Sequence, residues 1–421
     1  MKVLVIGSGG REHAIIKALK KSGRIEKLCA APGNGGISCD AECVQIRAVD
    51  IPAMTDYAVQ NKIDYAVVAP DNPLALGMVD SLELRGIRCF GPDRAAARIE
   101  SSKVFSKKIM KKYNIPTAYY ETFFDADKAS GYVKSSSVSF PIVIKADGLA
   151  LGKGVIIAQN LQEALDAIDS IMRKKKFGES GMNIVIEEFL TGHEVSILAF
   201  TDGKTIKPMI SSMDHKCAFD GNAGPNTGGM GVIAPNPHYT GEIAKVCEEK
   251  IFLPTIDAMK KEGCPFKGCL YFGLMLTSKG PMAIEYNCRF GDPETQAVLP
   301  LLQTDLLQIM EAVTDEKLEG VDIKWSPDHA ACVVLASGGY PDSYKTGFKI
   351  KGLNENGGVK DAVIYHAGTK FDGGNFYTSG GRVLGVTATA KSLDAALDSA
   401  YSAAEKINFE GIHYRKDIGK Y

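Results

Sequence analysis

The first 100 residues alternate short apolar runs with helical patterns, and this rhythm restricts the fold more than any other feature of the chain. Runs such as Val3–Ile6 and Ala66–Ala69 have the length of buried strands, and turns rich in Gly and Pro separate them from the helical stretches. Strands that alternate with helices form a parallel sheet, which binds ligands at the carboxyl ends of its strands. We expect an α/β domain whose ligand site lies on the loops Gly7–Arg11, Pro32–Gly36 and Pro70–Pro73.

At 421 residues the chain is too long for one ordinary hydrophobic core, so we expect two to four domains. The net charge of −1 gives no electrostatic reason to expect nucleic acid or an anionic membrane as partner. The N-terminus enters an apolar strand directly, without a signal-peptide pattern, and no later apolar run approaches a membrane span. We expect a soluble cytoplasmic protein, monomeric or weakly dimeric, that acts on small molecules.

The loop Gly7–Glu12 resembles the start of a dinucleotide-binding motif, but Glu12 stands where the third glycine would be. The dinucleotide interpretation therefore fails. A glycine loop that opens a helix can still bind a single phosphate through its backbone N–H groups, and Arg11 would add a guanidinium. The alternative is a tight turn without a ligand.

A later strand carries polar residues at alternating positions. Glu285, Asn287 and Arg289 would project from one face, because strand side chains alternate. A carboxylate and an amide oxygen suit Mg²⁺ that is shared with phosphates, and an arginine beside them suits a phosphoryl oxygen. The alternative is an amphipathic strand with a solvated face. Asp292 and Glu294 follow at once, either as further ligands or to shape the turn or contact an acceptor substrate.

A glycine-rich loop, Asp147–Gly154, joins the apolar strands Pro141–Ala146 and Val155–Ala158. It is not a P-loop, because it is one residue short, lacks Ser or Thr after its lysine and connects strand to strand. We interpret it as a flap on a hairpin, after which we expect a helix with Asn160 as N-cap and Glu163 three residues later. Lys145 lies within the first strand, where an unpaired ammonium is costly, so it needs an anion. A nucleotide phosphate is one candidate, and a salt bridge with Asp147 or a distant carboxylate is the other.

Other signals are weaker. The acids Glu187, Glu188 and Glu194 sit at strand ends, where they could bind adenine or ribose or could simply be exposed. The loop Gly224–Gly231 has four glycines in eight residues, which suits close approach to a ligand or a mobile surface loop. From about residue 328 the pattern indicates a small α+β domain, in which Arg382 could touch an anion or belong to a structural turn.

The ordered set of motifs resembles the phosphoribosylamine–glycine ligase (glycinamide ribonucleotide synthetase) family of the ATP-grasp superfamily. The motifs are Gly9–Ala14, Pro32–Asn34, Ile142–Ala150, Gly152–Gly154, Gly224–Gly231, Glu285–Gln296 and Tyr414–Gly419. The resemblance implies a multidomain α/β and α+β protein. Its parts would be a parallel α/β pre-ATP-grasp domain at 1–101, an ATP-grasp module at 102–326 with a mobile lid at about 118–190, and a small C-terminal α+β domain at 327–421.

The implied reaction joins glycine to 5-phosphoribosylamine and converts ATP to ADP and phosphate through glycyl phosphate, in purine biosynthesis. Glu285 and Asn287 would hold Mg²⁺ or Mn²⁺, Arg289 would neutralise the transferring phosphoryl group, and Asp214 would orient an amine. The residues implied for ATP are Lys103, Lys145, Asp147, Gly148, Gly152, Lys153, Gly154, Glu187, Glu188, Phe189, Leu190 and Glu194. Those implied for the substrates are Gly9, Gly10, Arg11, Glu12, Asn34, Asp214, Asn226, Thr227 and Asp292.

Two departures and two alternatives accompany the resemblance. Relatives usually carry Gly-Pro-Glu in the loop that reads Val68-Ala-Pro-Asp71-Asn72-Pro in this chain, and Asn72 cannot supply that carboxylate. The strand Tyr271–Met275 has no acid, whereas many ATP-grasp enzymes have one there. The alternatives are another ATP-grasp carboxylate–amine ligase or carboxylase-type enzyme, and a non-catalytic nucleotide-binding sensor.

Overall fold

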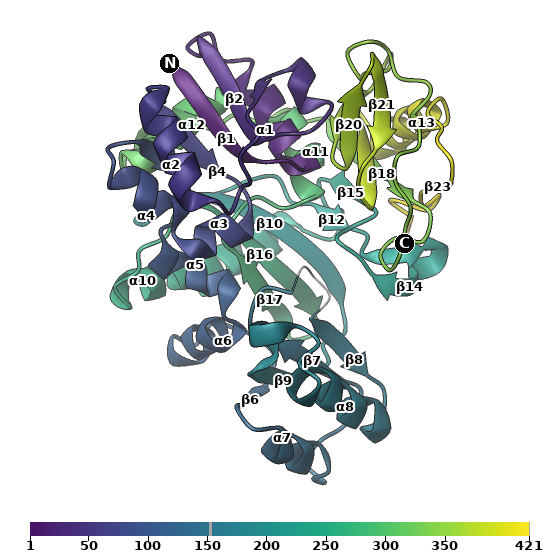
Figure 1. Ribbon diagram of the computed structural model, residues 1–421. Coiled ribbons are helices and arrows are strands. Elements are labelled where there is room, and N and C mark those ends of the chain that lie inside the picture. Colours follow the sequence, from purple (N-terminus) through teal and green to yellow (C-terminus); the bar gives the residue numbers. More distant parts are fainter. Residues whose placement is uncertain (151–153, 421) are drawn as a thin grey trace.

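The computed structural model describes residues 1–150 and 154–420 (Figure 1). Its N-terminal part is a five-stranded sheet in the order β3-β2-β1-β4-β5, in which every pair is parallel, as predicted. The strands are β1 (Lys2–Gly7), β2 (Lys27–Pro32), β3 (Glu42–Cys43), β4 (Tyr65–Val68) and β5 (Arg88–Phe90). The helices are α1 (Gly10–Leu19), α2 (Ile51–Gln60), α3 (Asp71–Leu76), α4 (Met78–Glu83) and α5 (Arg94–Ser101).

A four-stranded antiparallel sheet, which we call the lid sheet, projects away from the other parts in Figure 1. Its order is β6-β9-β7-β8, and its elements are β6 (Tyr120–Phe123), β7 (Ile142–Ala146), β8 (Val155–Ala158), β9 (Ile184–Glu188), α7 (Ala126–Val133) and α8 (Leu161–Ile168). Asn160 caps α8 as its side-chain oxygen accepts the Glu163 N–H at 3.0 Å, as the sequence predicts. β7 and β8 form the predicted hairpin.

The second sheet of the central region has the order β11-β10-β16-β17. Its strands are β10 (His193–Asp202), β11 (Ile206–Pro208), β16 (Lys267–Thr277) and β17 (Gly280–Asn287). The helices of this region are α6 (Lys103–Lys112), α9 (Gly241–Cys247), α10 (Leu253–Lys261), α11 (Glu294–Val298) and α12 (Leu306–Thr314).

The C-terminal sheet recruits strands from the central part of the chain. Its order is β12-β15-β18-β22-β19, with β23 beside β18. The strands are β12 (Met213–Asp214), β15 (Gly231–Ala234), β18 (His329–Ser337), β19 (Val363–His366), β22 (Arg382–Ala390) and β23 (Ile412–His413). Two hairpins, β13 (Cys217–Phe219) with β14 (Ala223–Asn226) and β20 (Thr369–Asp372) with β21 (Asn375–Thr378), and the helix α13 (Leu393–Ala404) complete this part.

Two hydrophobic cores combine residues of the N-terminal sheet with residues of β10 and β16, whereas the lid sheet has a core of its own. The N-terminal and second sheets therefore form one packed body, and the lid is a separate packing unit. Within residues 1–150 and 154–420, no helix has the length and apolar character needed to cross a membrane.

The hydroxyl of Tyr65 on β4 contacts the Met310 carbonyl at 2.8 Å and the Thr314 hydroxyl at 2.7 Å, both on α12. We predict that Tyr65→Phe lowers the thermal midpoint by about 2–4 °C, because a buried hydrogen bond is worth about 1 kcal/mol. Trp325, the single tryptophan, packs against the same core, so its fluorescence reports the change. Tyr119→Phe, at an exposed tyrosine, is the matched control, and equal effects of the two variants would contradict the prediction.

Candidate functional site

The candidate site lies at the end of β17. Glu285 and Asn287 share a strand face, opposite Gly273 and Tyr271 of β16, as the alternation predicts. A register shift just before them leaves Ile284 as the extra residue of a β-bulge. A Cβ at position 273 would lie 3.0 Å from Cγ of Glu285, so a glycine there makes room for this side chain.

Four cations surround Glu285, and we call them the ring of cations: Lys216, Lys145, Lys103 and Arg289. Burial favours the neutral acid, but Lys216, Lys145, Lys103 and Arg289 outweigh it and lower the pKa of the Glu285 carboxyl. The carboxylate is thus ionised at neutral pH. The structure brings together residues from the lid sheet, α6 and β17 that are far apart in the sequence.

The anion that Lys145 requires is a distant carboxylate in this structure. Its Nζ lies 2.9 Å from Oε1 of Glu187 and donates to the carbonyl of Ile284 at 3.1 Å, which the bulge presents. The other carboxylate oxygen lies 3.0 Å from Nζ of Lys107. Burial lowers the pKa of Lys107 to about 8, although Glu187 favours its charge. Glu187, expected near adenine, therefore has its carboxylate between two ammonium groups.

The start of the flap is fastened to α6. Oδ1 of Asp147 accepts the Val104 N–H at 2.8 Å, and Nζ of Lys103 donates to the Gly148 carbonyl at 3.2 Å. Burial lowers the pKa of Lys103, although Glu285 favours its charge. The Gly154 carbonyl accepts an N–H of β7 at 2.8 Å. The predictions for Gly152 and Lys153 lie outside the described residues.

The segment between β9 and β10 joins the lid sheet to the second sheet. It carries three residues expected at the nucleotide, Glu188, Phe189 and Leu190. Oε1 of Glu188 accepts the Tyr119 N–H at 2.9 Å. Glu194, at the start of β10, pairs with Lys216 at 3.2 Å and is the main cause of the raised pKa of that lysine.

Two carboxylates, those of Asp214 and Glu294, repel each other near Lys216. Oδ1 of Asp214 is buried and has no hydrogen-bond partner among residues 1–150 and 154–420. Burial and the neighbouring Glu294 raise the pKa of Asp214 well above its usual value, against the effect of Lys216. Oε1 of Glu294 accepts the Ser196 hydroxyl at 3.2 Å. An unpartnered acceptor next to a second acid suits a cationic N–H donor.

Arg289 follows the end of β17 and is tethered to α5. Its Nη2 lies 3.0 Å from Oε1 of Glu100, whose other oxygen accepts the Cys288 N–H at 2.7 Å. Burial opposes the charge of Arg289, but Glu100 and Asp71 raise its pKa.

The first N-terminal loop is braced internally and against the central region. Oε2 of Glu12 accepts the Gly9 N–H at 2.5 Å, and its Oε1 accepts from Nε of Arg11 at 2.6 Å. Nη1 of Arg11 donates to the Phe290 carbonyl at 3.2 Å. Glu12 therefore occupies the first helical turn of α1, where a third glycine would have left space.

The turn after β17 connects three regions. Asp292 pairs with Arg382 of β22 at 3.2 Å and accepts from Nε2 of Gln296 at 2.8 Å. A Cβ on Gly9 would lie 3.3 Å from Oδ2 of Asp292, and one on Gly10 would lie 2.5 Å from Nε2 of Gln296. Burial opposes ionisation of Asp292, but Arg382 lowers its pKa. Arg382 is thus a structural contact to a carboxylate.

The amide of Asn34 uses its full hydrogen-bonding capacity inside the protein. Nδ2 donates to the carbonyls of Ser8 at 2.8 Å and His366 at 2.7 Å. Oδ1 accepts the N–H groups of Gly36 and Ile37, both at 2.9 Å.

The loop Gly224–Gly231 contains two predicted substrate residues, Asn226 and Thr227, which lie in different surroundings. Oγ1 of Thr227 donates to the Lys216 carbonyl at 2.8 Å and accepts the Gly229 N–H at 2.9 Å, so Thr227 lies next to the ring of cations. Asn226 is exposed in the β13–β14 hairpin, where its Oδ1 lies 3.7 Å from Sγ of Cys217.

The donor set at the end of β17 fits a hard divalent cation. Glu285 is ionised, and Nδ2 of Asn287 donates to the Tyr286 carbonyl at 2.7 Å, which leaves the amide oxygen as the ligand atom. Carboxylate and amide oxygens suit Mg²⁺ or Mn²⁺, and phosphates and water complete such a shell.

Several residues of the site were missed by the sequence reasoning. They are Glu100, Lys107 and Lys216. Lys107 had a usable signal, because it follows Lys103 by four residues and so lies on the same helix face. Glu100 had none, since only the tertiary fold brings α5 to the end of β17.

Comparison with known families matches three consecutive regions. Residues 1–100 match the N domain of phosphoribosylglycinamide synthetase, 101–295 its ATP-grasp (A) domain and 330–421 its C domain.

A relative named phosphoribosylamine–glycine ligase, from Caldanaerobacter subterraneus subsp. tengcongensis, is 51% identical over 99% of this chain and 99% of its own length. The crystal structure of phosphoribosylamine–glycine ligase from Thermotoga maritima superposes with a TM-score of 0.85 at 33% identity, covering 99% of this chain and 100% of that one. The biotin carboxylase domain of Hydrogenobacter thermophilus 2-oxoglutarate carboxylase, solved with MgADP, shares the fold with a TM-score of 0.72 at 17% identity, over 98% of this chain and 91% of that one. The chain therefore belongs to the phosphoribosylglycinamide synthetase family.

Proposed function

We propose that this protein joins glycine to 5-phosphoribosylamine, with conversion of ATP to ADP and phosphate, in purine biosynthesis. Relatives that match nearly the whole chain carry the name phosphoribosylamine–glycine ligase. The observation that carries the proposal is the ionised Glu285 inside a ring of cations, beside the unpartnered acceptor of Asp214. Phosphoryl transfer needs this inventory, since it depends on positioning and charge neutralisation.

The reaction has two displacements. A glycine carboxylate oxygen attacks the γ-phosphorus of ATP, and the bond to the β-phosphate oxygen breaks to release ADP. The sugar amine then attacks the carbonyl carbon of glycyl phosphate, and phosphate leaves while the nitrogen loses a proton. Lys103, Lys145 and Arg289 neutralise the phosphate oxygens during the first step. The flap keeps water from the acyl phosphate.

Glu285 and Asn287 are the residues that would hold Mg²⁺ or Mn²⁺. The metal ion, when bound, supplies positive charge to the nucleotide phosphates and orients them. Of the protein's own groups, the four cations around Glu285 would also supply positive charge to the phosphates.

Asp214 and Glu294 suit the ammonium group of glycine. The buried Oδ1 of Asp214 is an acceptor without a partner among the described residues, and its raised pKa reports a site that favours added positive charge. The ammonium of glycine would supply that charge and place the carboxylate toward the phosphates. The loop Gly9–Glu12 at the start of α1 suits the sugar phosphate, because helix N-termini bind anions.

The test is ADP release together with mass-spectrometric detection of glycinamide ribonucleotide. We expect both to require glycine and phosphoribosylamine together. Stimulation by other carboxylic acids would indicate a different ATP-grasp ligase, and nucleotide binding without turnover would indicate a sensor. The proposal is abandoned if glycine gives no stimulation.

We predict that Glu285→Gln lowers kcat by about 10²–10⁴-fold with the fold intact, because one metal carboxylate is lost. Initial rates at saturating Mg²⁺ and circular dichroism measure the two effects. Glu42→Gln, at an exposed edge-strand acid paired with Lys27, is the matched control. Near-normal turnover of Glu285→Gln at ordinary Mg²⁺ would remove Glu285 from the metal role.

We predict that Asp214→Asn raises the KM for glycine about tenfold or more and also raises the thermal midpoint at pH 7.5 by about 1–3 °C. The folded-state pKa of Asp214 lies above its usual value of 3.8, so the folded protein binds this proton more tightly than the unfolded chain. Stability is therefore lost as pH rises through the window above 3.8, and the neutral amide avoids that loss.

Asp292→Asn is the opposite control for stability. The folded-state pKa of Asp292 is lowered, so its ionisation stabilises the fold above its usual pKa, and the amide removes this contribution. We expect a lower midpoint for this variant at pH 7.5. A fall for Asp214→Asn as well would contradict the assigned electrostatics.

A further inference from the structure

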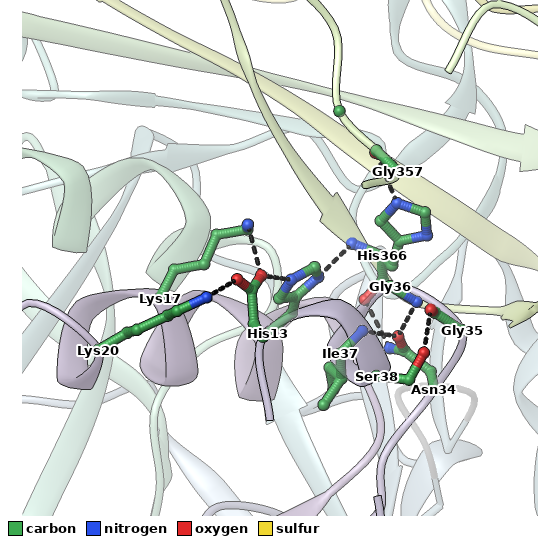
Figure 2. Close-up of polar contacts among 12 residues, drawn as sticks. His13, Lys17, Lys20, Asn34, Gly35, Gly36, Ile37, Ser38, Gly357 and His366 are labelled. Carbon is green, nitrogen blue, oxygen red and sulfur yellow. Dashed lines mark hydrogen bonds and ion pairs between the residues drawn. The ribbon is translucent and has the colours of Figure 1, made fainter. Parts of the chain in front are cut away.

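A buried histidine of α1 reaches across to the C-terminal sheet (Figure 2). Nδ1 of His13 accepts the backbone N–H of His366 at 2.8 Å, at the end of β19. Because a backbone N–H always donates, Nδ1 carries no proton and the ring proton sits on Nε2. Nε2 then donates to Oδ2 of Asp40 at 3.0 Å. Burial lowers the pKa of His13 to about 4, which keeps the ring neutral.

Asp40 fixes the orientation of this ring. Lys17 on α1 and Lys20, directly after its end, lie 2.6 and 2.7 Å from the Asp40 carboxylate. The two ammonium groups keep Asp40 ionised, so it remains an acceptor for Nε2–H of His13.

The loop Pro32–Gly36 binds the backbone carbonyl of His366, the residue whose N–H is bound by His13 (Figure 2). Nδ2 of Asn34 donates to the His366 carbonyl at 2.7 Å and to the Ser8 carbonyl at 2.8 Å. The neighbouring Gly35 N–H donates to the Thr369 carbonyl at 2.9 Å. His13 and Asn34 thus clamp the N–H and the C=O of one residue.

The side chain of His366 has further partners of its own. Nε2 of His366 donates to the Gly357 carbonyl at 2.8 Å, and Nδ1 lies 3.0 Å from the Thr369 hydroxyl. A Cβ on Gly36 would lie 2.1 Å from Cγ of His366, so the loop is in direct contact with the imidazole. The end of β19 therefore contacts both N-terminal segments, through His13 and through the loop Pro32–Gly36.

We propose that His13 and Asn34 are positioning residues for 5-phosphoribosylamine. By clamping His366 they set the loops Gly7–Arg11 and Pro32–Gly36 relative to each other and to the phosphoryl-transfer site. All hydrogen bonds of the Asn34 amide are made within the protein, so Asn34 acts on the substrate by positioning the loop. The inference rests on the proposed function, which gives the first of these loops the sugar phosphate.

Two isosteric variants of His13 separate its two hydrogen bonds. The Asn oxygen in His13→Asn replaces the Nδ1 acceptor, whereas the amide in His13→Gln replaces the Nε2 donor and leaves the His366 N–H unpaired. We expect His13→Asn to keep the KM for phosphoribosylamine within about threefold and His13→Gln to raise it about tenfold or more. The KM for ATP stays within about twofold in both, since the nucleotide lies on the lid side.

Asn34→Asp tests the other arm, because a carboxylate would face the Ser8 and His366 carbonyls without a proton to donate. We expect a KM for phosphoribosylamine raised at least as much as in His13→Gln. Asn61→Asp changes an amide that donates to one exposed carbonyl and should leave all constants unchanged.

The inference is wrong if His13→Asn and His13→Gln raise this KM equally, if His13→Gln leaves it normal, or if the KM for ATP rises in parallel. Thermal midpoints identify a variant that fails to fold. If Asn34→Asp fails to fold, the comparison between the two His13 variants still decides the question. Absence of product with the unaltered protein would instead overturn the proposed function.

Discussion

Mutual repulsion among the cations around Glu285 is the constraint on which the rest of the site depends. Three of the four cations are held beside an anion from another element: Lys145 beside Glu187, Arg289 beside Glu100 and Lys216 beside Glu194. Without these partners the ring would be strongly unfavourable in a region of reduced dielectric. A phosphate that enters the ring therefore exchanges one anionic partner for another, and the lysines are already oriented when it arrives.

Local sequence patterns predicted much of the fold. The βα rhythm of the first 100 residues predicted the parallel sheet, and the pair Asn160 and Glu163 predicted the start of α8. The alternation in β17 placed Glu285 and Asn287 on one face. Each of these signals depends on residues that are neighbours in the chain, so sequence spacing is enough to read it.

What the sequence could not supply depends on long-range contact. The bulge at Ile284 arises from pairing with β16, and no composition signal marks it. Glu187 reads as a strand-end acid, but its burial between two lysines follows from packing of the lid sheet against α6. The sequence indicates that Asn34 is a loop residue that could contact a ligand. In the structure its amide donates to the carbonyl of His366, which lies more than 300 residues later in the chain.

The recruitment of β12 and β15 into the C-terminal sheet has a consequence for synthesis of the chain. Both strands leave the ribosome about 100 residues before β18, the strand that pairs with β15. Until then β15 has an unpaired edge on the side that β18 will occupy. The N-terminal sheet, whose strands all lie within the first 90 residues, can form early. A nascent chain would thus complete the N-terminal sheet long before the C-terminal sheet, to which Asp214 on β12 belongs.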